Sequence, residues 1–124
     1  MPKNTAIPFF QAGPFTGTPT ADVTGKRFVK YAPGGKGGAP KIAPATAKLA
    51  VAGVAAHDQV TGVGVSVETD GVVPVTAGEA LTAGDKVAAG TDGVAMKAVA
   101  GDVVVGTATV EAAINTDAPI RLSV

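Results

Sequence analysis

Few side chains in this sequence are of a type that could carry out catalysis. It contains one histidine, His57, and no cysteine. A zinc site would therefore need several carboxylates at matching spacing, and the sequence places none around His57. The only serines, Ser66 and Ser123, do not sit in a nucleophile elbow. We interpret His57 and its neighbour Asp58 as ordinary turn residues, and we predict no catalytic site, no metal site and no cofactor.

Lys97 is the residue with the most specific chemical alternative. It lies in the tetrapeptide AMKA at 95–98, one residue away from the AMKM sequence that carries biotin in carboxylase carrier domains. Biotinyl and lipoyl domains present this lysine at the tip of a tight hairpin. Here the Asp-Gly turn at 92–93 precedes the lysine, which favours a strand over 94–99 with an unmodified, outward-facing Lys97. A carrier domain with Lys97 as the acceptor remains the alternative function.

Two basic segments raise the question of nucleic-acid binding. The segment GGKGG at 34–38 lacks the Lys-Ser/Thr end of a phosphate-binding loop. The segment RFVKY at 27–31 resembles an aromatic and basic strand that stacks RNA bases, but such a platform needs aromatic residues on a second strand. A nucleic-acid-binding module is therefore the less favoured alternative, and no nucleic-acid partner is expected.

Charged and aromatic residues divide at the same part of the chain. Residues 1–48 carry seven cationic side chains and one carboxylate, whereas residues 49–124 carry three and nine. All the aromatic residues lie in the first 31 positions: Phe9, Phe10, Phe15, Phe28 and Tyr31. Because aromatic side chains bury the most area per residue, the rest of the chain must build its core from smaller aliphatic residues. We interpret the aromatic residues of the leading segment as anchors for another surface.

The leading segment is predicted to be an extended arm. Prolines and glycines recur through residues 1–24, and proline also pushes the residue before it toward extended geometry, so a helix is excluded there. Residues 25–124 are predicted to form a β-domain. It begins with a short strand over 26–32, followed by a flexible basic loop over 33–41 that is rich in Gly and Pro.

The remainder of the chain has the pattern of short β-strands. Apolar residues alternate with polar ones at 63–68, 106–112 and 120–124, which is the period of a half-buried strand. The Ala-rich segment 43–56 is also interpreted as strand, and the proline in VVPV at 72–75 favours an edge position. Gly-Asp and Asp-Gly turns separate these segments. The pattern predicts an all-β fold, a small barrel or sandwich, with at most one short helix. No apolar stretch approaches the length of a membrane span.

The order of these segments resembles a known family. Residues 49–124 resemble the small capsid decoration, or cement, proteins of tailed phages. The features that carry the resemblance are GVAA at 53–56 followed by Asp58, GVVPV at 71–75, AGDKV at 83–87, the turn at 92–93 with a short strand after it, Val105-Gly106, and the final alternating strand.

The resemblance implies a non-enzymatic structural protein of the bacteriophage virion with a β-tulip-like barrel or sandwich. It also implies binding to major capsid protein subunits on the outer surface of an assembled capsid, capsid stabilisation, and a homotrimer, after synthesis in the host cytoplasm. No membrane partner is expected. Within this function, the division of charges and aromatic residues predicts three apolar anchors and three electrostatic guides: Phe9, Phe10 and Phe15, and Lys26, Arg27 and Lys30.

Overall fold

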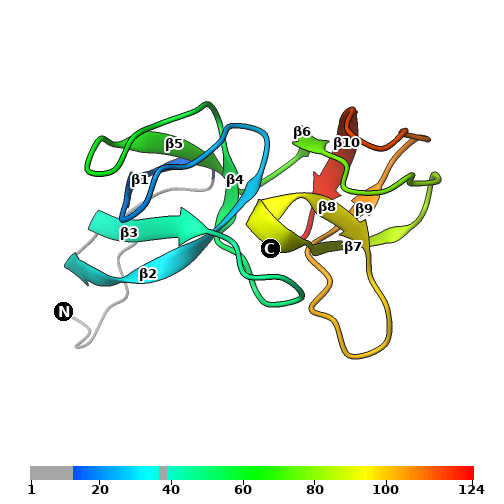
Figure 1. Ribbon diagram of the computed structural model, residues 1–124, viewed down its shortest axis with the longest axis horizontal. Coiled ribbons are helices and arrows are strands. Elements are labelled where there is room, and N and C mark those ends of the chain that lie inside the picture. The colour runs from blue at the N-terminus through cyan, green and yellow to red at the C-terminus, as the bar shows by residue number, and fades with distance from the viewer. Residues whose placement is uncertain (1–12, 37–38) are drawn as a thin grey trace, which may run out of the picture.

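A computed structural model describes residues 13–36 and 39–124. Ten β-strands and one 3-10 turn account for its regular structure, which confirms the predicted all-β fold. The first five strands close into a small barrel, in the order β1-β3-β2-β4-β5 (Figure 1). Their bounds are β1 Phe15–Pro19, β2 Phe28–Lys36, β3 Ala39–Pro44, β4 Gly53–Ala55 and β5 Val65–Glu68.

The other five strands form a separate sheet, in the order β6-β10-β9-β7-β8, which lies beside the barrel in Figure 1. The elements are β6 Val72–Thr76, β7 Lys86–Ala89, the 3-10 turn η1 Thr91–Gly93, β8 Ala95–Lys97, β9 Gly106–Ala108 and β10 Asp117–Leu122. We call residues 13–69 the barrel lobe and residues 70–124 the sheet lobe. No helix in the described part of the chain is long and apolar enough to cross a membrane.

Alternation along the strands fills the barrel as the sequence pattern predicts. In β5, Val65 and Val67 are buried, whereas the two residues that follow them are partly exposed. In β1, Phe15 pairs with Val67 across the sheet and points into the same interior. Val29 and Ile42 complete the centre of this cluster. The barrel therefore has a hydrophobic core of its own.

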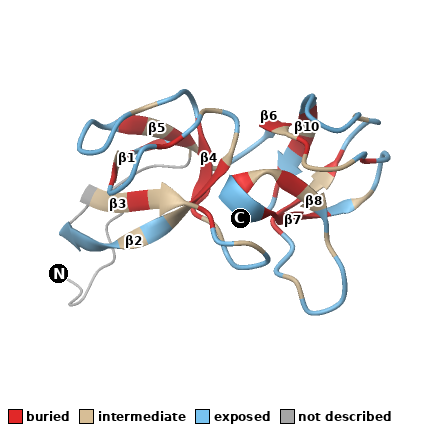
Figure 2. Cartoon of the chain, viewed as in Figure 1, coloured by how far each residue is buried: buried red, intermediate tan, exposed pale blue. Residues whose placement is uncertain are grey.

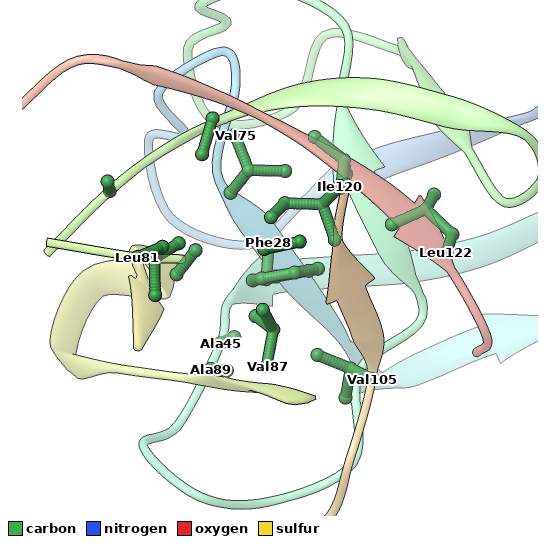
Figure 3. Close-up of a cluster of buried hydrophobic side chains, with 14 residues drawn as sticks. Phe28, Ala45, Val75, Leu81, Val87, Ala89, Val105, Ile120 and Leu122 are labelled. Carbon is green, nitrogen blue, oxygen red and sulfur yellow. The ribbon is translucent and has the colours of Figure 1, made fainter. Parts of the chain in front are cut away.

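The two lobes share a wall that is buried on both faces. In β2, the adjacent residues Phe28 and Val29 are both fully buried, although successive strand residues point to opposite faces. Val29 belongs to the barrel core, whereas Phe28 belongs to the core of the sheet lobe. Figure 3 shows the Phe28 ring among side chains of the sheet lobe, including Val87 and Ile120. Phe28 therefore supplies the large side chain that the sheet lobe lacks in its own sequence.

A close backbone approach fixes the junction between the lobes. Gly93 has φ 78° and lies against the backbone of Phe28, so that a methyl group at Gly93 would overlap the Phe28 carbonyl oxygen. The Thr76 N–H donates to the Lys26 carbonyl oxygen at 2.8 Å. Only glycine can adopt this positive φ at position 93 and also leave room for the Phe28 backbone without strain.

Both edges of the five-stranded sheet are blocked. β6 is an edge strand, as its proline predicts, and Pro74 has no N–H to offer a further strand. At the other edge, the β8 residue Ala95 accepts a hydrogen bond from the Gly78 N–H at 2.8 Å. The next outward-facing group of β8, the Lys97 N–H, donates to the Glu79 carboxylate at 3.1 Å. Because the other sheet is a closed barrel, the described residues offer no free edge for strand addition.

Three boundaries differ from the sequence prediction. Residues 15–24, expected in the arm, belong to the barrel lobe, and 15–19 form β1 between β3 and β5. The described residues of the expected flexible loop 33–41 lie mostly in β2 and β3, which pair as a hairpin. The expected strand over 43–56 is interrupted by a loop at 45–52. Extended conformation was predicted correctly for the first of these segments but not for the second, and in both cases the strand pairing depends on residues elsewhere in the chain.

Candidate docking surfaces

The predicted aromatic anchors do not form a surface among the described residues. Phe15 is only 8% exposed, and its ring stacks on Tyr31 with 5.8 Å between the centroids. Phe15 is therefore part of the barrel core, which corrects its expected role as an anchor. Tyr31 is the exposed member of this pair. Phe9 and Phe10 lie outside the described residues.

Two of the three predicted cationic guides are paired or partly buried. The Lys26 ammonium lies 2.8 Å from the Asp117 carboxylate, an ion pair that joins the two lobes, with both side chains about half exposed. Arg27 is partly buried, and its Nε is buried without a hydrogen-bond partner among the described residues. Neither residue projects from the molecule as an independent charge.

Lys30, the third guide, belongs to a larger basic surface. Its Nζ donates to the neutral Thr46 hydroxyl at 2.7 Å. Lys41 lies opposite Ala32 in the hairpin, so Lys30 and Lys41 share the outer face of β2 and β3. Lys48 follows Thr46 in the next turn, and Lys36 lies at the far end of β2. We define the basic face by these four residues: Lys30, Lys36, Lys41 and Lys48.

The basic face has no acidic counterpart, which the sequence signals plainly. Between residues 23 and 57 there are six cationic side chains and no carboxylate. The ion pairs among the described residues are Lys26–Asp117 and a longer contact of 3.9 Å between Lys97 and Asp85. Of the three predicted guides, Lys30 lies in the basic face, whereas Lys26 pairs with Asp117, a contact between distant segments that cannot be seen locally in the sequence.

Most carboxylates have structural tasks in loops. Six of them accept backbone N–H groups in turns or across neighbouring segments: Asp22, Asp58, Asp70, Glu79, Asp85 and Asp102. At Asp22 the Thr61 backbone N–H, and then its hydroxyl, hold the pKa of the carboxyl below its ordinary value. Short polar side chains stabilise turns by such bonds. The net charge is zero, but most of the carboxylates hold loops in place, whereas the lysines of the basic face have no carboxylate partner.

A second candidate surface is apolar and lies at the lobe junction. The loops 45–52 and 98–105 project from the same side of the junction in Figure 1, and Figure 2 shows both as largely exposed. They carry four large aliphatic side chains that are between 41% and 61% exposed. We define the ridge by these residues: Leu49, Val99, Val103 and Val104.

Hydrogen bonds hold the ridge in place. Val99 and Asp102 close a turn in both directions: the Asp102 N–H donates to the Val99 carbonyl, and the Val99 N–H donates to the Asp102 carboxylate, each at 3.0 Å. The Val103 N–H donates to the Lys48 carbonyl at 3.1 Å, which ties the two loops together. The Lys48 N–H in turn donates to the Ala89 carbonyl at 2.8 Å. The exposed aliphatic side chains are thus presented on a fixed frame.

A groove of about 430 Å³ adjoins the ridge on the outer face of β7 and β8. Its apolar lining includes Ala88, Val94, Met96 and the ridge residue Val99. Gly78 and Gly90 leave room for Met96, since a methyl group at either position would lie within 2.6 Å of its side chain. The ridge and the groove therefore form one continuous apolar surface.

Lys97 and His57 lie where the sequence places them. Lys97 is in β8 with an exposed side chain, which confirms the predicted strand position, and it is not at a hairpin tip. Its unmodified state remains a prediction. His57 lies in an exposed turn with Nδ1 2.8 Å from the Asp58 carbonyl oxygen. No three His, Asp or Glu side chains of the described residues gather closely enough to hold a metal ion.

Comparison with known proteins identifies a matching family and a similar solved structure. A family model described as phage cement protein matches residues 10–124. Among solved structures, the chain is similar to the N base of head fiber gp8.5 of bacteriophage phi29, with 25% sequence identity and a TM-score of 0.74. That similarity covers 89% of this chain and 92% of the other. No curated protein matches the chain.

Proposed function

Because the chain belongs to the phage cement protein family, we propose that it is a structural protein of the virion that binds major capsid protein subunits on the outer surface of an assembled capsid. The similarity to a head fiber base supports a place on the phage head. The family model covers both lobes, whereas the resemblance in the sequence was limited to residues 49–124.

The basic face is the observation that carries this proposal. Lys30 and Lys41 share the outer face of β2 and β3, Lys36 ends β2, and Lys48 lies in the turn after β3. No ion pair with a described carboxylate neutralises these four lysines. A surface of this kind suits an acidic patch on a partner, because complementary charges increase the association rate and fix the orientation of the complex. Lys26 and Arg27 contribute less, since one is paired with Asp117 and the other is partly buried.

The N-terminal segment adds the apolar part of the contact. Residues 1–12 precede Gly13, whose carbonyl oxygen accepts a hydrogen bond from the Thr69 hydroxyl at 2.9 Å. Twelve extended residues span at most about 40 Å, enough to reach well beyond the barrel. Phe9 and Phe10 are the anchors we propose in this segment. Full burial of one such side chain contributes about 2 kcal/mol, more than the roughly 1 kcal/mol at most of an exposed ion pair.

Stabilisation of the capsid follows if each copy bridges neighbouring coat subunits. We propose that the protein does this as a homotrimer and without enzymatic activity, after synthesis in the host cytoplasm. Cyclic assemblies place identical contacts on every subunit, so three copies multiply a weak individual contact. The blocked sheet edges support contact through side-chain surfaces rather than through added strands.

Co-sedimentation with assembled capsids that lack the protein tests the proposal. The full chain should bind assembled capsids and should not bind unassembled coat monomers. The triple variant K30Q/K36Q/K41Q should bind roughly fivefold more weakly per removed cation, with the largest loss at low salt. The matched control is K86Q, because Lys86 also donates to a threonine hydroxyl, that of Thr107, but lies in the sheet lobe.

Two results would count against the proposal. A wild-type chain that fails to bind assembled capsids removes the function itself. A triple variant that binds as tightly as K86Q at every salt concentration removes the basic face as the contact. Deletion of residues 2–12 then measures the remaining contribution, and we expect it to weaken binding more than the triple variant does.

A further inference from the structure

The apolar groove on β7 and β8 meets the basic face at one residue, Lys48. Half-buried aliphatic side chains, among them Val94 and Met96, line the groove, and Lys48 lies at its border. The function proposed above uses the basic face but leaves the groove without a partner. A hollow that is mostly apolar and has a few charged groups at its border is the usual form of a binding site.

Among the charged side chains that line the groove, Lys48 is the one without a partner. The Glu79 carboxylate accepts the Lys97 N–H at 3.1 Å, and the Asp102 carboxylate accepts a backbone N–H of its own turn at 3.0 Å. The Lys97 ammonium lies 3.9 Å from the Asp85 carboxylate. The Lys48 ammonium makes no ion pair and no hydrogen bond with a described residue. A carboxylate brought by an occupant would therefore find its counterion at Lys48.

The backbone of Lys48 points to the same residue. Lys48 has φ 68°, a left-handed conformation that side chains other than glycine adopt at a cost. Two hydrogen bonds to the sheet lobe, to the Ala89 carbonyl and from the Val103 N–H, hold it there. Glycine would fit this backbone without strain, so the fold itself does not explain a long cationic side chain. Strained positions of this kind concentrate at functional sites.

We propose that the groove and Lys48 together bind a protein segment in which a carboxylate side chain stands next to large aliphatic residues. The aliphatic side chains lie against Val94 and Met96, and the carboxylate pairs with the Lys48 ammonium. Met96 is unbranched and can adapt to the side chains that it meets. That the segment belongs to the major capsid protein rests on the proposed function, since the groove adjoins the basic face.

The chain itself supplies no matching segment. Residues 1–21 contain Lys3 and no carboxylate, so the N-terminal segment of this or another copy would bring a like charge to Lys48. The ridge of a second copy offers one carboxylate, that of Asp102, and the Val99 N–H already holds it. Charge complementarity therefore favours a different protein over self-association.

Titration of the isotope-labelled full chain with three capped tripeptides, followed by NMR, tests the recognition chemistry. The probes are Leu-Glu-Leu, Leu-Gln-Leu and Leu-Lys-Leu, acetylated and amidated so that the central side chain alone differs in charge. Leu-Glu-Leu should shift the amide signals of β7, β8 and Lys48. It should bind roughly threefold more tightly than Leu-Gln-Leu, as an exposed ion pair allows, and Leu-Lys-Leu should bind most weakly.

Substitutions at position 48 separate the charge from the fold. K48Q should remove the preference for Leu-Glu-Leu, and K48E should reverse it in favour of Leu-Lys-Leu. K48G should also lose the preference, although its denaturant midpoint should equal or exceed that of the wild type because glycine relieves the backbone strain. The control is K86Q, since Lys86 is an exposed cation of β7 that does not line the groove, and it should keep the preference.

A second pair of variants tests the apolar part of the contact. V99S shortens an exposed aliphatic side chain of the groove and should weaken all three peptides by a similar factor. V110S is the matched control, because Val110 is an exposed valine of the loop between β9 and β10 and lies outside the groove. It should bind each peptide as the wild type does.

The proposal is overturned if the wild type binds the three peptides equally or not at all, or if K48E does not reverse the order. It is also overturned if assembled capsids bind the wild type but bind K48E and V99S as tightly. A wild type that prefers Leu-Glu-Leu but binds no capsid supports the recognition chemistry and contradicts the proposed function. Loss of capsid binding in K48E and V99S, with K86Q and V110S unaffected, supports both.

Discussion

The two lobes solve the problem of a small core in different ways. The barrel closes five strands around its own cluster, with Phe15, Val29 and Ile42 inside it. The sheet lobe is open, has no aromatic residue of its own, and completes its core with Phe28 from β2. A small lobe built from Val, Ala and Leu buries limited area by itself. The shared wall of β2 and β4 therefore makes the core of the sheet lobe dependent on the barrel.

The surfaces of the lobes differ in a corresponding way. Lysines outnumber acids on the barrel and lack ionic partners along the outer face of its hairpin, whereas the carboxylates at the loops of both lobes accept backbone N–H groups. The ridge lies where a loop from the barrel lobe meets a loop from the sheet lobe. Lys48 belongs to the basic face and also borders the groove, so the basic and the apolar surfaces adjoin each other.

Removal of β1 should have the largest effect on the two lobes. Deletion of residues 2–20 takes away the strand that pairs with both β3 and β5 and removes Phe15 from the core. We expect the barrel to open and the sheet lobe to lose its support, so that no cooperative unfolding transition remains. Deletion of residues 2–12 ends before the barrel and should leave the midpoint of denaturant unfolding nearly unchanged. A folded 2–20 deletion would show that the barrel lobe is not needed.

Phe28 tests the dependence with a single side chain. Phe28→Ala removes a fully buried ring from the core of the sheet lobe, and large-to-small changes of this kind cost about 3–5 kcal/mol. Val67→Ala in the barrel core is the comparison and should cost less, because fewer atoms are removed. Hydrogen exchange should show protection lost first in β7 to β10 for Phe28→Ala. Equal loss in both lobes would mean that they unfold as one unit.

Gly93 tests the junction through the backbone alone. Gly93→Ala combines a positive φ with overlap on the Phe28 carbonyl oxygen, and we expect it to lower the free energy of unfolding by more than about 2 kcal/mol. Gly101→Ala is the matched control, since Gly101 has φ 93° but no atom within 4 Å of the added methyl group. Its cost should be about 1 kcal/mol from conformation alone. Similar costs at both positions would remove the close approach as a cause.

The sequence predicted those parts of the fold that depend on neighbouring residues, such as the alternation of apolar side chains and the position of proline. Alternation identified β5 and β10, the proline at 74 identified an edge strand, and the family resemblance is confirmed. The division into two lobes was missed, because two adjacent buried residues, Phe28 and Val29, do not reveal that each faces a different core. The same limit affected the site. Phe15 looked like an anchor because its partners in β3 and β5 come later in the chain.

The smallest effect expected is a pH dependence in the barrel lobe. Asp22 accepts hydrogen bonds from the Thr61 N–H and hydroxyl, which fix the segment before β2 against the loop before β5. Because these bonds lower the pKa of Asp22 in the folded chain, their stabilisation is present above the unfolded value of 3.8 and is lost as the pH falls through the lowered pKa. The unfolding midpoint of Asp22→Ala should therefore lie below that of the wild type by a constant amount between about pH 5 and 7, and the difference should shrink below about pH 4.

Glu111→Ala is the control, since the Glu111 carboxylate makes no hydrogen bond to another described residue, and its difference from the wild type should not follow this course. A gap for Asp22→Ala that persists at low pH would assign the effect to the loss of side-chain packing rather than to the charge.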